Sequence, residues 1–135
     1  MERKYFSLEE ANQLLPLVQS ELTYLQELKK QFYQKYHELQ SVKKRLAYVA
    51  KTDTALKDEV FTLECQLDFM DIEARMRLKN LIDKGIQVKD IDIGLVDFPA
   101  LLNGEEVLLC WKQGEEQITH YHGEQDGFAG RKPLQ

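Results

Sequence analysis

Hydrophobic residues recur at every seventh position through the first third of the chain. Ser7 and Glu10 precede this run in the S-x-x-E pattern of a capping box, which predicts that a helix begins at Leu8. The repeated positions are Ala11, Val18, Leu25, Phe32, Leu39 and Leu46, and the partner position is half-filled by Leu14, Leu28, Val42 and Val49. A seven-residue apolar repeat keeps one seam toward a partner helix. We therefore predict a coiled-coil-like helix over residues 8–50.

Polar residues and a proline interrupt this first helix. Glu21 and Lys35 occupy seam positions where the repeat calls for apolar side chains. Pro16 cannot donate a hydrogen bond to the preceding turn. It predicts either a kink near Gln13 or a later start of the helix.

A second helical pattern follows a short polar turn. Residues 51–54, Lys-Thr-Asp-Thr, favour a turn and an N-cap, and Gly85 supplies a stop, which predicts a helix over residues 55–84. Its seam consists of Leu56, Val60, Leu63, Leu67, Met70, Ala74, Leu78 and Leu81. Because the connection is short, the two helices should lie antiparallel. Residues 7–84 are thus predicted to form a helical hairpin.

The second helix also carries an additional apolar row. Its members are Phe61, Cys65, Phe69, Ile72 and Met76. A two-helix hairpin buries only one face of each helix, and burying such side chains is worth roughly 1.5–3 kcal/mol each. Either the C-terminal segment or the same face of a second chain could cover the row. The first helix, at roughly 60 Å against about 45 Å, would overhang the second. This overhang favours a homodimer formed through helix two.

Beyond Gly85 the hydrophobic period changes to the alternation of β-strands. Val88, Ile91 and Ile93 alternate with polar residues, and residues 95–99 form a second extended piece. Residues 105–111 and 117–122 flank a turn in which Gly114 supplies a positive φ, which predicts a β-hairpin. We expect an antiparallel sheet of two or three strands, then an irregular glycine-containing tail over residues 123–135. The chain is predicted to be a single α+β domain, residues 1–135, with its β unit at 85–135.

The charge distribution restricts the classes of partner that the chain can bind. The net charge is −5, and residues 85–135 carry four basic against nine acidic side chains, the opposite of a nucleic-acid groove. Charges interrupt the longest candidates for a membrane span every few residues, and the N-terminus lacks the apolar core of a signal peptide. We therefore expect no nucleic acid and no membrane as partners. A cytoplasmic location would keep Cys65 and Cys110 as thiols.

Two histidines are the first candidates for chemistry. His120 and His122 lie two apart on a predicted strand and so share a face, and imidazole pairs of this spacing can bind a transition metal. Cys110 or Asp97 could supply a third ligand. The alternative is that both histidines are ordinary polar residues beside Tyr121. Because the chain lacks C-x-x-C and H-E-x-x-H patterns, no cofactor is predicted, and a transition metal is the alternative.

The segment Gly-Phe-Ala-Gly-Arg at residues 127–131 is the second candidate. Its glycines permit a concave backbone, and the Arg131 guanidinium can bind a carboxylate or phosphate through two parallel hydrogen bonds. The favoured alternative is a tail clamped onto its own sheet by Phe128. In that case Arg131 would pair with Asp90, Asp92, Asp97 or Asp126. Trp111 is expected to anchor the core or an interface.

Several of these motifs together resemble a known family. They are Gly-Leu-Val-Asp-Phe-Pro at residues 94–99, Cys110–Trp111, His122, residues 127–131 and the helix start at residues 6–11. The string is similar to the prokaryotic family known as domain of unknown function 2203, over the whole chain. The resemblance implies a small cytoplasmic bacterial protein with a helical part and a β part. It implies no activity.

These observations favour a non-enzymatic module for protein interaction or scaffolding, with an unknown protein partner and self-association through the helices. Its distinctive surface would surround Trp111, Tyr121 and Arg131. The candidate binding residues are Asp97, Trp111, His120, His122, Asp126 and Arg131. The rival interpretation is a metal-dependent or small-anion-binding enzyme, built around Cys110, His120, His122 and Arg131.

Overall fold

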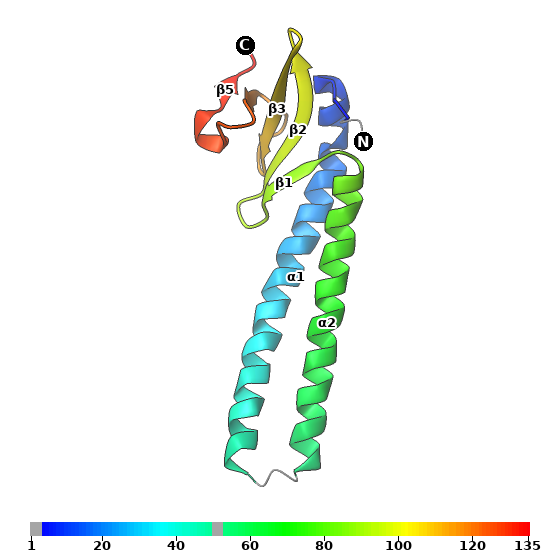
Figure 1. Cartoon of the computed structure of the whole chain (residues 1–135), viewed down its shortest axis with the longest axis vertical. Helices are drawn as coiled ribbons and strands as arrows, with labels where there is room; N and C mark the ends of the chain where they lie inside the picture. Colours follow the sequence, from blue (N-terminus) through cyan, green and yellow to red (C-terminus); the bar gives the residue numbers. More distant parts are fainter. Residues whose placement is uncertain (1–3, 50–52) are drawn as a thin grey trace. The chain divides into compact units, whose positions relative to one another are not determined.

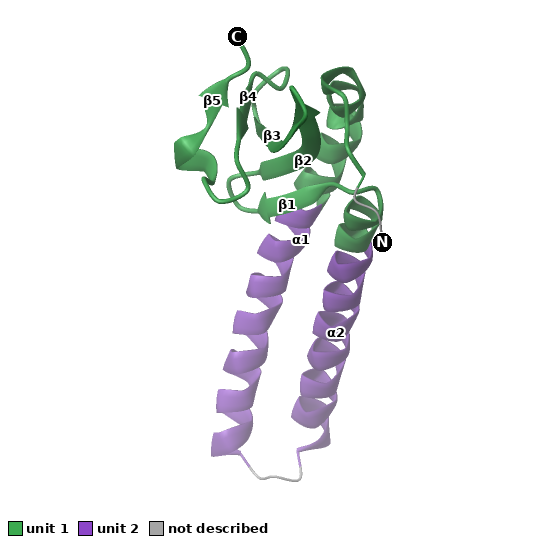
Figure 2. Ribbon diagram, turned by 45° about the horizontal axis from the view of Figure 1, so that its top comes forward, with its two compact units in different colours: residues 1–24, 77–135 green, residues 25–76 purple. Residues whose placement is uncertain are grey.

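The computed structural model describes residues 4–49 and 53–135, and it divides into two compact units. Unit 1 contains residues 1–24 and 77–135, and unit 2 contains residues 25–76 (Figure 2). The elements follow the chain as two long helices, α1 (Leu8–Tyr48) and α2 (Thr54–Asp83), and then five short strands (Figure 1). This order confirms the predicted α+β class.

The capping box forms and sets the start of α1. The Glu10 amide donates to the Ser7 hydroxyl oxygen at 3.0 Å, and the Ser7 amide donates to Glu10 Oε1 at 3.1 Å. Pro16 lies inside α1, which begins at Leu8, so the later start is wrong. The Leu56 amide donates to the Asp53 carboxylate at 3.1 Å and caps α2. The expected end of helix one at Ala50 and the turn at residues 51–52 lie outside the described residues.

Unit 2 contains the C-terminal part of α1 and the N-terminal part of α2, which run antiparallel (Figure 2). Their shared core is formed by the buried Leu39, Val42, Leu63 and Leu67, with the partly buried Phe32, Leu56 and Val60 packed against it. These are seam positions of both predicted repeats. Within unit 2, the hydrophobic periodicity therefore identifies the packed faces correctly.

Unit 1 contains an antiparallel sheet in the order β1-β2-β3-β4-β5. The strands are β1 (Gln87–Asp90), β2 (Leu95–Leu102), β3 (Glu105–Lys112), β4 (His120–His122) and β5 (Lys132–Pro133). The expectation of two or three strands is therefore wrong. The tail was expected to be irregular, but it forms a short 3-10 helix, η1 (Phe128–Gly130), and then β5. Two-residue strands are too short to leave a recognisable alternation in the sequence.

Two predicted strands are shorter than expected. Ile91 and Ile93 lie in a turn after β1, where the Asp90 carboxylate accepts the Ile93 amide at 3.1 Å. A side chain that bonds its neighbouring backbone in this way ends a strand. Residues 117–119 lie outside β4: the Ile118 amide donates to Asn12 Oδ1 at 2.8 Å, and the Thr119 carbonyl accepts the Leu134 amide at 2.9 Å. The register of β1 also shifts between Val88 and Asp90.

The inner face of the sheet packs on the parts of the helices that belong to unit 1. The core residues from the helices and their flanks are Phe6, Ala11, Leu15, Val18, Leu22, Leu81 and Ile86, and those from the sheet include Val96, Phe98, Ala100, Val107, Leu109 and Trp111. The Phe6 and Phe98 rings meet edge to face at 5.4 Å. Trp111 is 2% exposed, and its indole N–H donates to the Glu115 carbonyl at 2.9 Å. It is a core residue.

The two central strands are buried on both faces. Every residue from Val96 to Ala100 in β2 and from Val107 to Trp111 in β3 is buried. Such strands read as continuous apolar runs unless polar residues stand on one face. Asp97 and Cys110 are therefore unusual positions that need an explanation. Among the described residues, neither helix contains a stretch that is long and apolar enough to cross a membrane.

Replacing Phe98 by alanine should remove a large part of the core in unit 1. We expect Phe98→Ala to lower the free energy of unfolding by about 3–5 kcal/mol, because the cavity adds to the lost transfer free energy. Leu101, on the same strand but 53% exposed, is the matched control, and Leu101→Ala should change stability by less than about 0.5 kcal/mol. Urea denaturation followed by circular dichroism measures both. Equal losses in the two variants would contradict this packing.

Candidate functional site

A cluster of three polar side chains lies on the outer face of the sheet. Asp97 of β2 and Cys110 of β3 are direct cross-strand partners, and His122 of β4 pairs with Leu108, two residues before Cys110. Residues two apart on a strand share a face, so all three lie opposite the core face. One potential ligand atom from each lies within 4.8 Å of the other two, and all three residues are buried. We call Asp97, Cys110 and His122 the sheet triad.

Both ring nitrogens of His122 contact oxygen atoms. Nε2 lies 3.1 Å from Asp97 Oδ2, and Nδ1 lies 2.7 Å from the Gly123 carbonyl oxygen. A carbonyl oxygen can only accept, so Nδ1 carries the hydrogen in this contact. The carbonyl thereby orients the ring and directs Nε2 toward the Asp97 carboxylate.

Burial controls the protonation of the other two members of the triad. It raises the pKa of the Asp97 carboxyl, although the neighbouring His122 and Lys89 act in the opposite direction. Burial also raises the pKa of the Cys110 thiol to about 11, and the Asp97 charge adds to the effect, whereas Arg131 opposes it. At neutral pH Cys110 is consequently a protonated thiol. It does not have the thiolate character of an activated nucleophile.

Arg131 forms a two-pronged ion pair beside the triad, and its partner is Glu115. Its NH1 and NH2 atoms lie 3.2 and 3.0 Å from Glu115 Oε1 and Oε2. The guanidinium also lies over the Phe128 ring, 4.5 Å from its centroid. The expected pairing with one of four aspartates is wrong. The turn at Gly114 allows Glu115 to accept the Lys112 amide at 2.8 Å, which holds its carboxylate in place.

Of the remaining candidates, His120 and Asp126 lie outside the triad. The His120 ring is half-buried, and its Nδ1 lies 2.8 Å from the Thr119 hydroxyl oxygen. The structure thus assembles His122 with Asp97 and Cys110 rather than with His120. The Asp126 carboxylate accepts the Gly123 amide at 3.1 Å and closes a local turn.

The sequence does not predict two groups that bind the candidate site residues. Glu115 is one, and the Gly123 carbonyl that orients His122 is the other. The turn glycine at position 114 was recognised, but a turn alone does not indicate which side chain folds back. A backbone carbonyl leaves no signal in a sequence at all.

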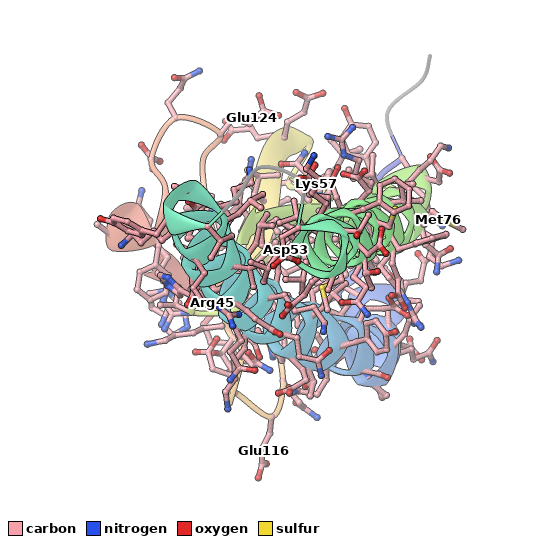
Figure 3. All side chains as sticks on the ribbon, turned by 90° about the horizontal axis from the view of Figure 1, so that it is seen from below. Arg45, Asp53, Lys57, Met76, Glu116 and Glu124 are labelled. Carbon is pink, nitrogen blue, oxygen red and sulfur yellow. The ribbon has the colours of Figure 1, made fainter. Side chains whose placement is uncertain are left out.

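A second candidate surface lies on α2 in unit 2. The outer row is Phe61, Cys65, Phe69, Ile72 and Met76. Phe61 is 70% exposed, Phe69 73% and Met76 67%, while Cys65 is half-buried. Figure 3, which looks along the helices, shows Met76 projecting outward from α2. Several large apolar side chains in one exposed row are typical of an interaction surface.

Comparisons with known proteins identify a family but no characterised relative. The model of a family described as Uncharacterized conserved protein (DUF2203) matches residues 4–134, nearly the whole chain. No curated protein and no solved structure matches the chain.

The burial of Cys110 makes a prediction about thiol reactivity. In a Cys65→Ser variant Cys110 is the remaining thiol, and we expect it to resist a disulfide reagent at pH 8 because it is 1% exposed and its pKa is about 11. One thiol per chain should react once the protein is unfolded in urea. Absorbance of the released reagent measures both. Rapid labelling of the folded variant would contradict a buried, protonated thiol.

The ion pair between Arg131 and Glu115 should make stability fall in acid. Burial tends to raise the pKa of Glu115, but the hydrogen bonds from Arg131 and the Lys112 amide outweigh it, and the pKa is lowered from its ordinary value of 4.5. A lowered pKa stabilises the fold above the ordinary value, and the contribution disappears as the pH falls through the folded-state pKa.

We expect Glu115→Gln to cost about 1 kcal/mol at pH 7, a value that allows for solvent screening of this partly exposed pair. The loss relative to wild type should shrink as the pH falls below 4.5 and through the lowered pKa of Glu115. Urea denaturation at each pH measures it. Glu116→Gln, one residue along and exposed, is the matched control and should parallel the wild type throughout. A pH-independent loss in Glu115→Gln would rule out the ion pair as the cause.

Proposed function

The chain belongs to the DUF2203 family of uncharacterised proteins, and we propose that it is a non-enzymatic interaction module that self-associates through the outer row of α2. The observation that carries the proposal is the exposure of Phe61, Phe69 and Met76, each at least 67%. Full burial of such side chains is worth roughly 1.5–3 kcal/mol each. The helix pair leaves these side chains exposed to water, and packing against the same row of a second chain would bury them and stabilise the dimer.

The row lies on the side of α2 that the unit 2 core does not use. Core positions Leu63 and Leu67 are buried. On a helix with 3.6 residues per turn, positions 61, 65, 69, 72 and 76 fall within one stripe, roughly opposite to positions 63 and 67. Self-association through the row therefore needs no rearrangement of the hairpin.

Charge along α2 favours a second copy of the chain as the partner. Six acidic residues and no basic residue lie between positions 58 and 73, namely Asp58, Glu59, Glu64, Asp68, Asp71 and Glu73. Basic residues follow at positions 75, 77 and 79. Antiparallel alignment of two α2 helices about Phe69 would put the basic end of each beside the acidic stretch of the other. Such complementarity favours this alignment over a parallel one, which would place like charges together.

Catalysis by the outer face of the sheet has weaker support. The Cys110 thiol is protonated at neutral pH, whereas a cysteine nucleophile must be a thiolate. The NH1 and NH2 groups of Arg131 are both hydrogen-bonded to Glu115, whereas an anion-binding arginine needs them available for the ligand. We extend the proposal to a cytoplasmic scaffold whose assembled form binds a further, unknown protein partner.

Light scattering tests the self-association. We expect the wild type to show twice the chain mass of 15.8 kDa at micromolar concentration. Phe61→Glu with Phe69→Glu should give a monomer with an unchanged helical circular dichroism spectrum, because two buried charges oppose the interface. Tyr33→Glu with Tyr36→Glu, exposed aromatic positions of α1 in the same unit, is the matched control and should remain dimeric.

Two results would overturn the proposal. A wild type that stays monomeric at all accessible concentrations removes the interface altogether. If the α1 control dissociates while the α2 variant does not, the partner surface lies on α1 instead.

A further inference from the structure

We propose that Asp97, Cys110 and His122 form a binding site for a divalent transition metal ion of the zinc class. The three side chains come from three neighbouring strands, and each offers one ligand atom toward the other two. The proposal concerns unit 1 alone and does not depend on the self-association of α2.

The donor atoms suit such an ion. Thiolate sulfur, imidazole nitrogen and carboxylate oxygen are the three zinc ligands that proteins use, at about 2.0–2.3 Å from the metal. In a tetrahedral site these bond lengths separate the ligand atoms by about 3.3–3.8 Å. His122 Nε2 and Asp97 Oδ2 are already 3.1 Å apart, and no pair in the triad exceeds 4.8 Å. Side-chain rotations that bring the ligand atoms about 1 Å closer together therefore suffice to reach tetrahedral distances.

The orientation of His122 is a second, independent observation. Its Nδ1 hydrogen is donated to the Gly123 carbonyl at 2.7 Å, which leaves Nε2, 3.1 Å from Asp97 Oδ2, as the nitrogen available to a metal. Metal-binding histidines nearly always donate their other ring hydrogen to a carbonyl or carboxylate in this manner. The ring is therefore held as a ligand before any ion arrives.

The charges also balance. The metal would displace the proton of the Cys110 thiol and the proton shared between His122 Nε2 and Asp97 Oδ2, and two protons would leave to solvent. A dication with one thiolate, one carboxylate and one neutral imidazole has no net charge. The nearby Arg131 guanidinium is neutralised by Glu115, so it does not repel the ion strongly. The positive charge of Lys89 on β1 also acts on Asp97 and favours the ionised carboxylate that the metal requires.

Three protein ligands leave a fourth position for water or a small ligand. A structural zinc site normally fills all four positions with side chains, whereas a site with three protein ligands keeps one position open. The sheet triad supplies three ligands. Such binding would cross-link β2, β3 and β4 through side chains.

Cobalt(II) titration of chelator-treated protein tests the site. Cobalt(II) takes the same ligands as zinc, and its complexes absorb visible light, so that binding can be followed by absorbance. We expect saturation at one ion per chain, visible absorption bands typical of tetrahedral cobalt, a near-ultraviolet thiolate-to-cobalt band, and displacement by zinc. Cys65→Ser should keep the near-ultraviolet band and Cys110→Ser should lose it, which assigns the sulfur ligand.

The histidines provide the matched pair. His122→Ala should weaken cobalt binding at least about tenfold, whereas His120→Ala, two residues away on the same strand, should leave it within about twofold. If His122→Ala or Cys110→Ser fails to fold, Cys65→Ser still decides the matter, because its thiolate band can come only from Cys110. The proposal fails if wild type binds no stoichiometric cobalt or zinc, if the Cys65→Ser variant lacks the thiolate band, or if His120→Ala is the variant that loses the ion.

Discussion

The packing of the inner sheet face onto the helix ends of unit 1 is the constraint on which the rest of that unit depends. Phe98 and Trp111 fill this core, and the Phe6 amide donates to the Pro99 carbonyl at 2.7 Å, which ties the chain before α1 to β2. Because strand side chains alternate between faces, committing Phe98 and Trp111 to the core sends Asp97 and Cys110 to the opposite face. The sheet triad is thus a consequence of how the core is packed.

Much of the helical part could be predicted from local patterns, and much of the sheet could not. A capping box and a seven-residue repeat depend on nearby residues, so the structure confirms Ser7, Glu10 and the seam residues that form the unit 2 core. Val49, which the repeat also assigns to the seam, is 42% exposed. The pairing of Asp97 with Cys110 depends on the register of β2 against β3, which is set by the tight turn at Asn103 and Gly104, both with positive φ. Asp97 and Cys110 were recognised as candidate ligands, but the sequence could not choose between the two histidines. His120 pairs directly with Cys110 across β3 and β4, yet its ring contacts the Thr119 hydroxyl, whereas the Gly123 carbonyl orients the ring of His122 toward Asp97.

Glu21, which interrupts the apolar repeat of α1, forms an ion pair that fixes the alignment of the helices in unit 1. It stands at a seam position of α1, is 6% exposed, and its Oε1 lies 3.0 Å from Arg77, whose guanidinium lies over the Tyr24 ring at 3.9 Å. Among the described residues, Glu21 Oε2 has no hydrogen-bond partner. A shifted helix register would separate Glu21 from Arg77 and leave a buried charge unpaired, which is strongly unfavourable. The ion pair therefore selects one alignment of the two helices within unit 1.

The edges of the sheet restrict how two molecules can meet. At one edge, β5 has two residues and contains Pro133, which has no amide hydrogen to offer a neighbouring strand. At the other, β1 has four residues and a shifted register. Short, irregular edges of this kind resist the addition of a foreign strand, which is the common first step toward aggregation. Any contact between copies of the chain would therefore be made by side chains rather than by backbone pairing, which disfavours open-ended assembly through the sheet.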